Sequence, residues 1–300
     1  MYSKTLEKLD VENLKIGVAL GGGSARGYAH IGALAALEQY NIKPAVIAGT
    51  SFGAVIGAMY ASGKNPAQMA EIAKNMRRRD LFSYVGRDLG LHRVALFSGN
   101  GLERYYREVI ADIQIEDLEK ELIVVTTDVD SGERVLLSSG DLARALRASS
   151  SIPGIFAPVN IDGRRLVDGG LGSPIPFESL KRDDLDLVIG IGAGTTSDES
   201  VSIRRTKNLL NTKWGKSLHN KLEASLNTNP FSRLGRGLAY TANTYMLEPN
   251  PELLQVHTMP PINWLEFNKA ELAIDAGKKA LEAFMPRIIA DIKDLKNKAA

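Results

Sequence analysis

The chain has 300 residues, a net charge of +2 at pH 7, and ordinary globular fractions of hydrophobic (44%) and charged (24%) residues. This weak charge gives no reason to expect nucleic acid as the main partner. Because the chain has no cysteine, a disulfide framework, a thiolate nucleophile and a cysteine-based metal site are excluded. The polar first residues lack the apolar stretch of a secretory signal, so we expect a cytoplasmic protein.

Strand and helix patterns alternate through the first 195 residues. Apolar runs predict strands at 15–20, 45–48, 122–127, 134–137 and 187–191. Helices are predicted at 27–40, directly after Ser51, from Pro66, at 103–110 and from a cap at Asp141 to Arg147, whereas 77–100 reads as irregular. This alternation predicts a three-layer α/β/α fold with a mainly parallel central sheet.

Strand patterns become scarce after about residue 195. We therefore expect an N-terminal segment (1–14), an α/β domain (15–195) and a C-terminal helical extension (196–300) packed on or near that domain.

Residues 49–53 form a G-x-S-x-G pentapeptide, Gly-Thr-Ser-Phe-Gly, between an apolar strand and a helix of small residues. A serine on so sharp a turn has its hydroxyl lifted clear of the backbone at the positive end of a helix, which makes Ser51 a candidate nucleophile. The alternative is a plain strand–loop–helix connection with an incidental serine. The uncharged stretch 45–62 is as long as a membrane span, but Gly49-Thr50-Ser51 breaks it, which favours a buried strand and helix.

A glycine loop, 21–27, lies between the first predicted strand and helix. Its backbone N–H groups could bind an anion, either a nucleotide phosphate or the oxyanion formed when Ser51 attacks an ester. The G-x-G-x-x-G spacing is not met, and no acidic residue follows about 20 positions later, as a ribose site requires. The pattern therefore favours an oxyanion hole.

Ser51 needs a base, and the chain has four histidines. A triad in the order Ser, Asp, His requires His219 or His257, but neither lies in a motif, so structural or surface roles are favoured for all four. A carboxylate alternative is Asp168, although its Asp-Gly pair alone reads as a hairpin turn.

Four motifs together resemble the patatin-like phospholipase family over about residues 15–195. They are the glycine loop ending in Arg-Gly, G-x-S-x-G, Ala-Ser-Ser-Ser-Ile-Pro-Gly-Ile-Phe at 148–156, and Asp-Gly-Gly at 168–170. The resemblance implies a lipid acyl hydrolase with no metal or cofactor, in which Ser51 is the nucleophile and Asp168 the base. It also implies an oxyanion hole at Gly22, Gly23 and Ser24, and supporting roles for Gly21, Arg26, Gly27, Gly49, Gly53, Gly169 and Gly170. Ser24 departs from the glycine of many relatives, so a positive φ there would strain the loop.

Two alternatives remain open for the function. One is a lipid-binding or regulatory patatin-like protein with weak or no turnover; the other is a Ser–Asp–His esterase. The expected partner is a phospholipid or another acyl-ester lipid.

A basic stretch at 204–221 carries a leucine and tryptophan stripe at helical spacing. It indicates peripheral contact with an anionic membrane through Lys213, Trp214 and Lys216. The same stripe could instead pack on the domain or on a second subunit of an oligomer.

Overall fold

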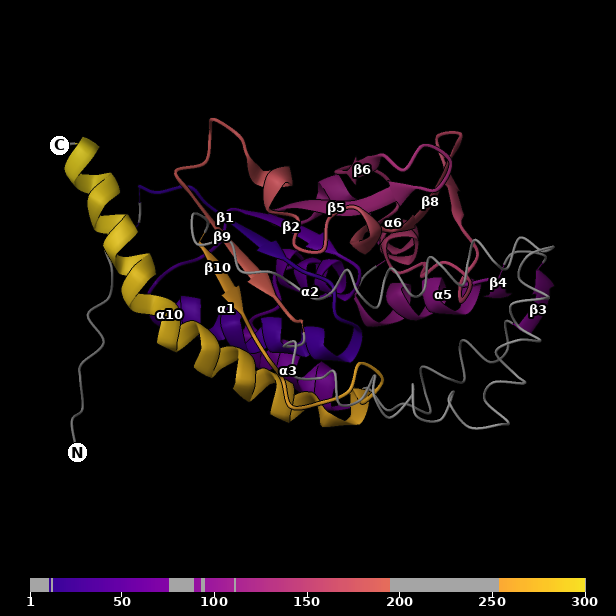
Figure 1. Cartoon of the computed structure of the whole chain (residues 1–300), viewed down its shortest axis with the longest axis horizontal. Helices are drawn as coiled ribbons and strands as arrows, with labels where there is room; N and C mark the ends of the chain where they lie inside the picture. The colour runs from indigo at the N-terminus through magenta and orange to yellow at the C-terminus, as the bar shows by residue number, and fades with distance from the viewer. Residues whose placement is uncertain are drawn as a thin grey trace, which may run out of the picture.

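The computed structural model describes residues 11, 13–75, 89–92, 95–110, 112–194 and 254–299. Figure 1 shows a central sheet with helices packed against it, and α10 running along one side of the molecule. The predicted α/β class is confirmed.

The sheet has eight strands. Their spatial order is β10 (Gln255–His257), β9 (Leu187–Gly192), β1 (Ile16–Leu20), β2 (Val46–Thr50), β5 (Glu121–Asp128), β8 (Arg164–Asp168) and β7 (Val159–Ile161), while β6 (Arg134–Leu137) pairs with β5. The five strands from β10 to β5 are parallel. The β5–β6, β5–β8 and β7–β8 pairs are antiparallel. The sheet is therefore mainly parallel, as predicted.

The two faces of the sheet are covered differently. Alternate residues of β1, such as Val18 and Leu20, belong to the large core shared with the helices. The opposite face, represented by Ala19 and Val125, packs against side chains of the segment 175–188. Within the described residues this segment, with its short 3₁₀ helix η4 (Phe177–Leu180), supplies the third layer. Burial on both faces explains why the parallel strands read as continuous apolar runs.

The helices agree with the predicted positions. They are α1 (Ala29–Gln39), α2 (Phe52–Ala61), α3 (Pro66–Asn75), α5 (Asn100–Val109), α6 (Leu142–Ser149) and α10 (Ala270–Ala299), with 3₁₀ helices η1 (Ser24–Tyr28), η2 (Ile115–Asp117), η3 (Gly169–Leu171) and η6 (Phe267–Lys269). Asp141 caps α6 by accepting a hydrogen bond from the Arg144 N–H, as expected. The stretch 45–62 forms β2 and α2, and no helix in the described ranges is both long and apolar enough to cross a membrane.

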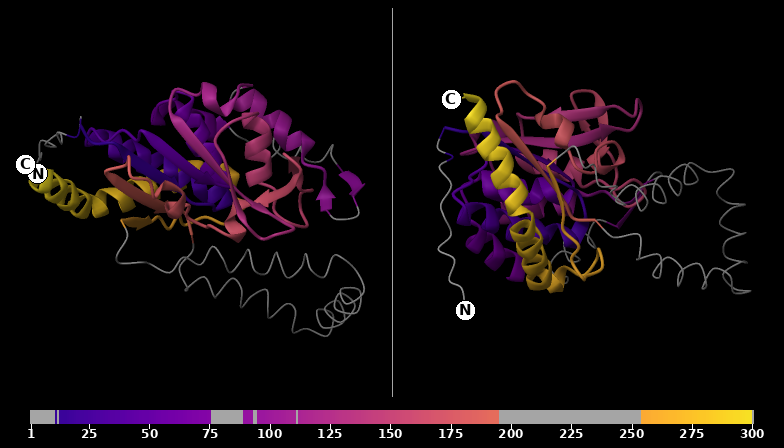
Figure 2. Two further views of the ribbon diagram at one scale, coloured as in Figure 1. Left: turned by 90° about the horizontal axis from the view of Figure 1, so that it is seen from above. Right: turned by 60° about the vertical axis from the view of Figure 1, so that its left-hand side comes forward.

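The C-terminal part of the chain is not only helical. Strand β10 joins the sheet beside β9, so this part of the chain contributes a strand as well as helix α10. Helix α10 packs along α1 and buries the side of α1 that faces away from the sheet (Figures 1 and 2). The predicted domain boundary at 195 stays a prediction. The stretch 204–221 lies outside the described residues.

One local prediction was wrong, and one alternative reading of the sequence does not hold. Within 77–100, β3 (Leu89–His92) and β4 (Ala95–Phe97) form an antiparallel pair, whose strands are too short to show an alternating pattern. Asp168-Gly169 is not a hairpin turn: β8 ends at Asp168, and η3 follows. The hairpin between β7 and β8 instead turns at Asp162-Gly163, where both residues have positive φ.

Candidate active site

Ser51 occupies a strained turn between β2 and α2. Its φ of 53° and ψ of −128° lie outside the regions that side-chain-bearing residues favour, at a cost of about 1–3 kcal/mol. The two motif glycines permit the turn. A Cβ on Gly49 would lie 2.3 Å from the Ala54 Cα, and one on Gly53 would lie 2.3 Å from the Leu20 carbonyl oxygen. The motif glycines are therefore explained by close backbone contact.

Ser149, the last residue of α6, holds this turn. The Ser51 N–H donates to the Ser149 Oγ at 2.8 Å, and the Ser149 hydroxyl donates to the Val125 carbonyl at 2.7 Å. Ser149 is fully buried. Sequence reasoning recognised the serine run 149–151 as part of a motif but did not find this role. The only signal was three consecutive polar residues at the end of a helix that packs against the sheet.

The Ser51 hydroxyl donates to Asp168 Oδ2 at 2.7 Å, across 117 residues of sequence. Asp168 is fully buried at the end of β8, and its Oδ1 accepts a hydrogen bond from the Gly170 N–H at 2.8 Å. Its own N–H donates to the Ser151 carbonyl at 3.0 Å. Gly169 must be small, because a Cβ there would lie 2.2 Å from the Val125 carbonyl oxygen. The carboxylate is thus fixed with one oxygen toward Ser51.

No histidine with a described side chain is bonded to the Ser51 hydroxyl. His30 lies in α1, fully buried, and its Nε2–H donates to the Gly21 carbonyl at 2.7 Å. Burial lowers the His30 pKa from 6.5 to about 4, so this imidazole is neutral at pH 7. His257 lies in β10, where burial also lowers its pKa. The His92 side chain and the whole of His219 lie outside the described residues.

The glycine loop leaves two backbone donors free. The Gly21 N–H donates to the Ile191 carbonyl at 2.8 Å, and the Gly22 N–H donates to the Pro174 carbonyl at 3.0 Å. Within the described part of the chain, the N–H groups of Gly23 and Ser24 have no acceptor. Ser24 has a φ of 51°, so the departure from glycine does place a side chain at a positive φ. Of the three predicted oxyanion donors, Gly22 is already paired.

The remaining motif residues of the glycine loop, Arg26 and Gly27, pack against other parts of the structure. The Arg26 Nε–H donates to the Ile262 carbonyl at 3.0 Å, and Arg26 is buried. A Cβ on Gly27 would lie 2.7 Å from the Phe52 ring, so the residue after Ser51 packs directly on the loop. The predicted membrane contacts Lys213, Trp214 and Lys216 lie outside the described residues.

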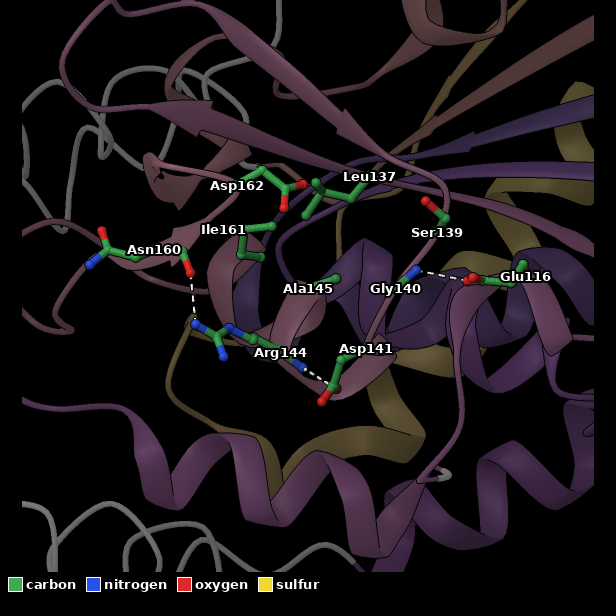
Figure 3. A pocket seen from close by; sticks show the side chains of 10 residues that line it. All are labelled: Glu116, Leu137, Ser139, Gly140, Asp141, Arg144, Ala145, Asn160, Ile161 and Asp162. Carbon is green, nitrogen blue, oxygen red and sulfur yellow. Dashed lines mark hydrogen bonds between the residues drawn. The ribbon is translucent and has the colours of Figure 1, made fainter.

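A separate pocket of about 570 Å³ opens around the start of α6 (Figure 3). Its polar groups pair with one another: Arg144 donates to the Asn160 carbonyl at 2.7 Å, and the Gly140 N–H donates to Glu116 at 2.7 Å. Ser149 lies at the other end of α6, about 12 Å away for an eight-residue helix. The pocket is therefore distinct from the Ser51 turn.

Comparisons with known proteins show which proteins this chain resembles. The family model for patatin-like phospholipase matches residues 18–181, more than half of the chain. An uncharacterized NTE family protein of Mycobacterium tuberculosis is 34% identical over 177 residues, which cover 59% of this chain and 48% of that protein. Lysophospholipase nte1 of Aspergillus fumigatus is 28% identical over 288 residues, 91% of this chain and 18% of that protein. This chain thus spans about half or less of the length of these relatives.

Among solved structures, VipD from Legionella pneumophila aligns with a TM-score of 0.47 and 14% identity, covering 92% of this chain and 67% of that one. The family match includes the glycine loop, the Ser51 turn and Asp168. The chain belongs to the patatin-like phospholipase family.

Proposed function

We propose that this chain is a lipid acyl hydrolase of the phospholipase A or lysophospholipase type, with Ser51 as nucleophile and Asp168 as base. The observation that carries the proposal is the 2.7 Å hydrogen bond from the Ser51 hydroxyl to Asp168 Oδ2. It joins two motifs 117 residues apart, at a turn whose backbone strain is maintained by a buried partner.

The chemistry follows from these positions. Ser51 Oγ attacks the ester carbonyl carbon while its proton passes to Asp168 Oδ2. The oxyanion that forms accepts hydrogen bonds from the free N–H groups of Gly23 and Ser24. When the carbon–oxygen bond of the ester breaks, the leaving alcohol takes the proton from Asp168 and the acyl group stays on Ser51.

Water then completes the cycle. It attacks the acyl-enzyme carbonyl and gives a proton to Asp168, and Ser51 recovers this proton as the free fatty acid leaves. No metal or cofactor takes part in these steps. The orientation of the Asp168 carboxylate supports a dyad of Ser51 and Asp168. The Gly170 N–H orients this carboxylate, which reaches the Ser51 hydroxyl without an imidazole between them.

The substrate class rests on the family and on the name of one relative, lysophospholipase nte1. The proposed substrates are phospholipids, lysophospholipids or related acyl esters. The proposed location is the cytoplasm, with peripheral membrane contact.

The test is a panel of p-nitrophenyl esters and defined phospholipids, together with fluorophosphonate labelling of Ser51. We expect Ser51→Ala to abolish turnover and labelling, and Asp168→Asn to lower kcat by about 10²–10⁴-fold in a folded protein. His257→Ala and His219→Ala should retain most of the rate. Loss of activity in either folded histidine variant would establish a triad instead. A protein that binds lipid but neither labels nor turns over would be the regulatory alternative.

A further inference from the structure

Large apolar side chains are exposed on the segment between β10 and α10. Met259 is 49% exposed, Trp264 44% and Leu265 38%. Among the residues that the structure describes, six large hydrophobic side chains are at least 38% exposed, and three of the six lie between residues 259 and 265. Figure 1 shows the segment as the orange loop that leads into α10. We call the three side chains the 259–265 patch. Three exposed large apolar side chains so near one another in sequence make this segment a candidate contact surface.

The segment that bears the patch is bonded to the glycine loop. The Ala25 N–H donates to the Trp264 carbonyl at 3.0 Å, and the Arg26 side chain donates to the Ile262 carbonyl at 3.0 Å. The same segment therefore both presents Trp264 outward and holds the backbone that follows Gly23 and Ser24.

Aromatic packing joins the segment to the nucleophile turn as well. The Phe267 ring lies 5.7 Å from the ring of Phe52, the residue after Ser51, and 6.1 Å from that of Tyr28. All three rings are buried. The segment that bears the patch thus adjoins the two backbone elements that would act on an ester.

The patch is held on an ordered turn. The Asn263 N–H donates to Glu266 Oε2 at 2.8 Å, and the Glu266 N–H donates to the Asn263 carbonyl at 3.0 Å. Glu266 is also paired with Lys269 at 2.8 Å. The Glu266 side chain, next to Leu265 in sequence, is thereby engaged, and a turn that is already fixed loses less entropy on docking.

We propose that Met259, Trp264 and Leu265 dock on the surface of the lipid aggregate that contains the substrate; this rests on the proposed function. An exposed tryptophan beside a leucine suits the boundary between headgroups and acyl chains, because the indole ring is apolar with one polar N–H. Docking there would bring the glycine loop and the Ser51 turn to the substrate's source. The contact is apolar, so it should need no anionic lipid and should resist salt.

The first test measures co-sedimentation of the Ser51→Ala protein with phosphatidylcholine vesicles in 0.1 M and 0.5 M NaCl. We expect binding at both salt concentrations, and Trp264→Ser with Leu265→Ser should weaken it about five- to tenfold. The matched control is Leu136→Ser, because Leu136 is 44% exposed on β6, a strand that pairs with β5 and not with β10. Equal binding by the patch and control variants would overturn the proposal. Binding that requires anionic lipid and disappears at 0.5 M NaCl would overturn it too.

A second readout follows Trp264 alone. The chain has two tryptophans, so Trp214→Phe leaves Trp264 as the single tryptophan. Its emission should shift to the blue when phosphatidylcholine vesicles are added. An unshifted spectrum in a vesicle-bound protein would contradict the proposal. Sedimentation equilibrium without lipid tests whether a second copy of this chain binds the patch instead. A dimer that dissociates in the patch variants would show that it does, and would overturn the proposal. All of these experiments measure binding or association and not turnover, so failure of the Ser51 chemistry leaves them interpretable.

Discussion

The Ser149 hydroxyl oxygen accepts a hydrogen bond from the Ser51 backbone N–H at 2.8 Å, although the two residues lie 98 positions apart in sequence. The same hydroxyl donates to the Val125 carbonyl in β5, so one side chain ties the Ser51 turn to the central sheet. Ser51 keeps a positive φ only while the surroundings support it. Ser149 is thus placed to control where the Ser51 hydroxyl points without touching a substrate.

Ser149→Ala should lower kcat on a soluble ester by about 10- to 100-fold with little change in KM. The substitution removes the acceptor of the Ser51 N–H, and a displacement of about 1 Å at a reacting atom can cost about 10²-fold. Steady-state kinetics on a p-nitrophenyl ester measure the effect.

The control is Ser150→Ala, the next residue, whose hydroxyl accepts from buried Tyr106 at 3.0 Å. Both variants leave a buried donor unsatisfied and should lose about 1–3 kcal/mol of unfolding free energy. Only Ser149→Ala should also lose kcat. Equal kcat losses in the two proteins would reduce Ser149 to a structural role.

Gly23→Ala should lower kcat/KM by at least about 10²-fold, because a Cβ would lie 2.5 Å from the Ala193 carbonyl oxygen and push the free N–H groups of the loop out of place. Gly172→Ala is the control, since a Cβ there would meet nothing nearer than the Thr127 hydroxyl at 3.6 Å. Comparable kcat/KM values for the two variants would argue against this loop as the oxyanion site.

Much of the fold was predictable because the parallel strands are buried on both faces. β1, β2, β5 and β9 therefore carry unbroken apolar runs, and Asp141 marks the start of α6 with an ordinary cap. β3 and β4 were missed because four- and three-residue strands depend on their neighbours rather than on a pattern of their own.

The motifs led us to predict Ser51 and Asp168 as site residues, but they could not show which neighbouring groups hold these two side chains. Whether a backbone N–H of the glycine loop is free depends on carbonyl groups that are distant in sequence. The Pro174 carbonyl accepts the hydrogen bond of the Gly22 N–H, and the sequence of the loop does not indicate this. Tertiary packing brings Ser149 to the Ser51 turn and the segment around Trp264 to the glycine loop. The sequence spacing of these residues does not predict either contact.

Ser24→Gly should stabilise the protein by about 0.5–1 kcal/mol. A residue with a side chain at a φ of 51° pays about 1–2 kcal/mol, and the greater chain entropy that glycine loses on folding offsets part of the gain. Thermal unfolding should show a rise in Tm of about 1–3 °C. Ser24→Ala keeps a Cβ at the same φ and should show no such rise. A lower Tm for the glycine variant would mean that the Ser24 side chain stabilises the loop.

Acid should destabilise the fold through His30. Its pKa is about 4 in the folded protein and 6.5 in the unfolded chain, so between these values the unfolded chain binds a proton that the folded one does not. Stability from this group is therefore fully present above pH 6.5 and is lost as pH falls toward 4. The loss should reach about 2–3 kcal/mol at pH 4.5. Urea unfolding of the wild type at pH 7.5 and pH 4.5 measures it against His30→Gln, whose amide can still donate to the Gly21 carbonyl but does not titrate. Carboxylates contribute equally to both proteins, so the wild type should lose more stability than the variant over this interval. If the two lose the same amount, His30 is not the group that links acid to unfolding.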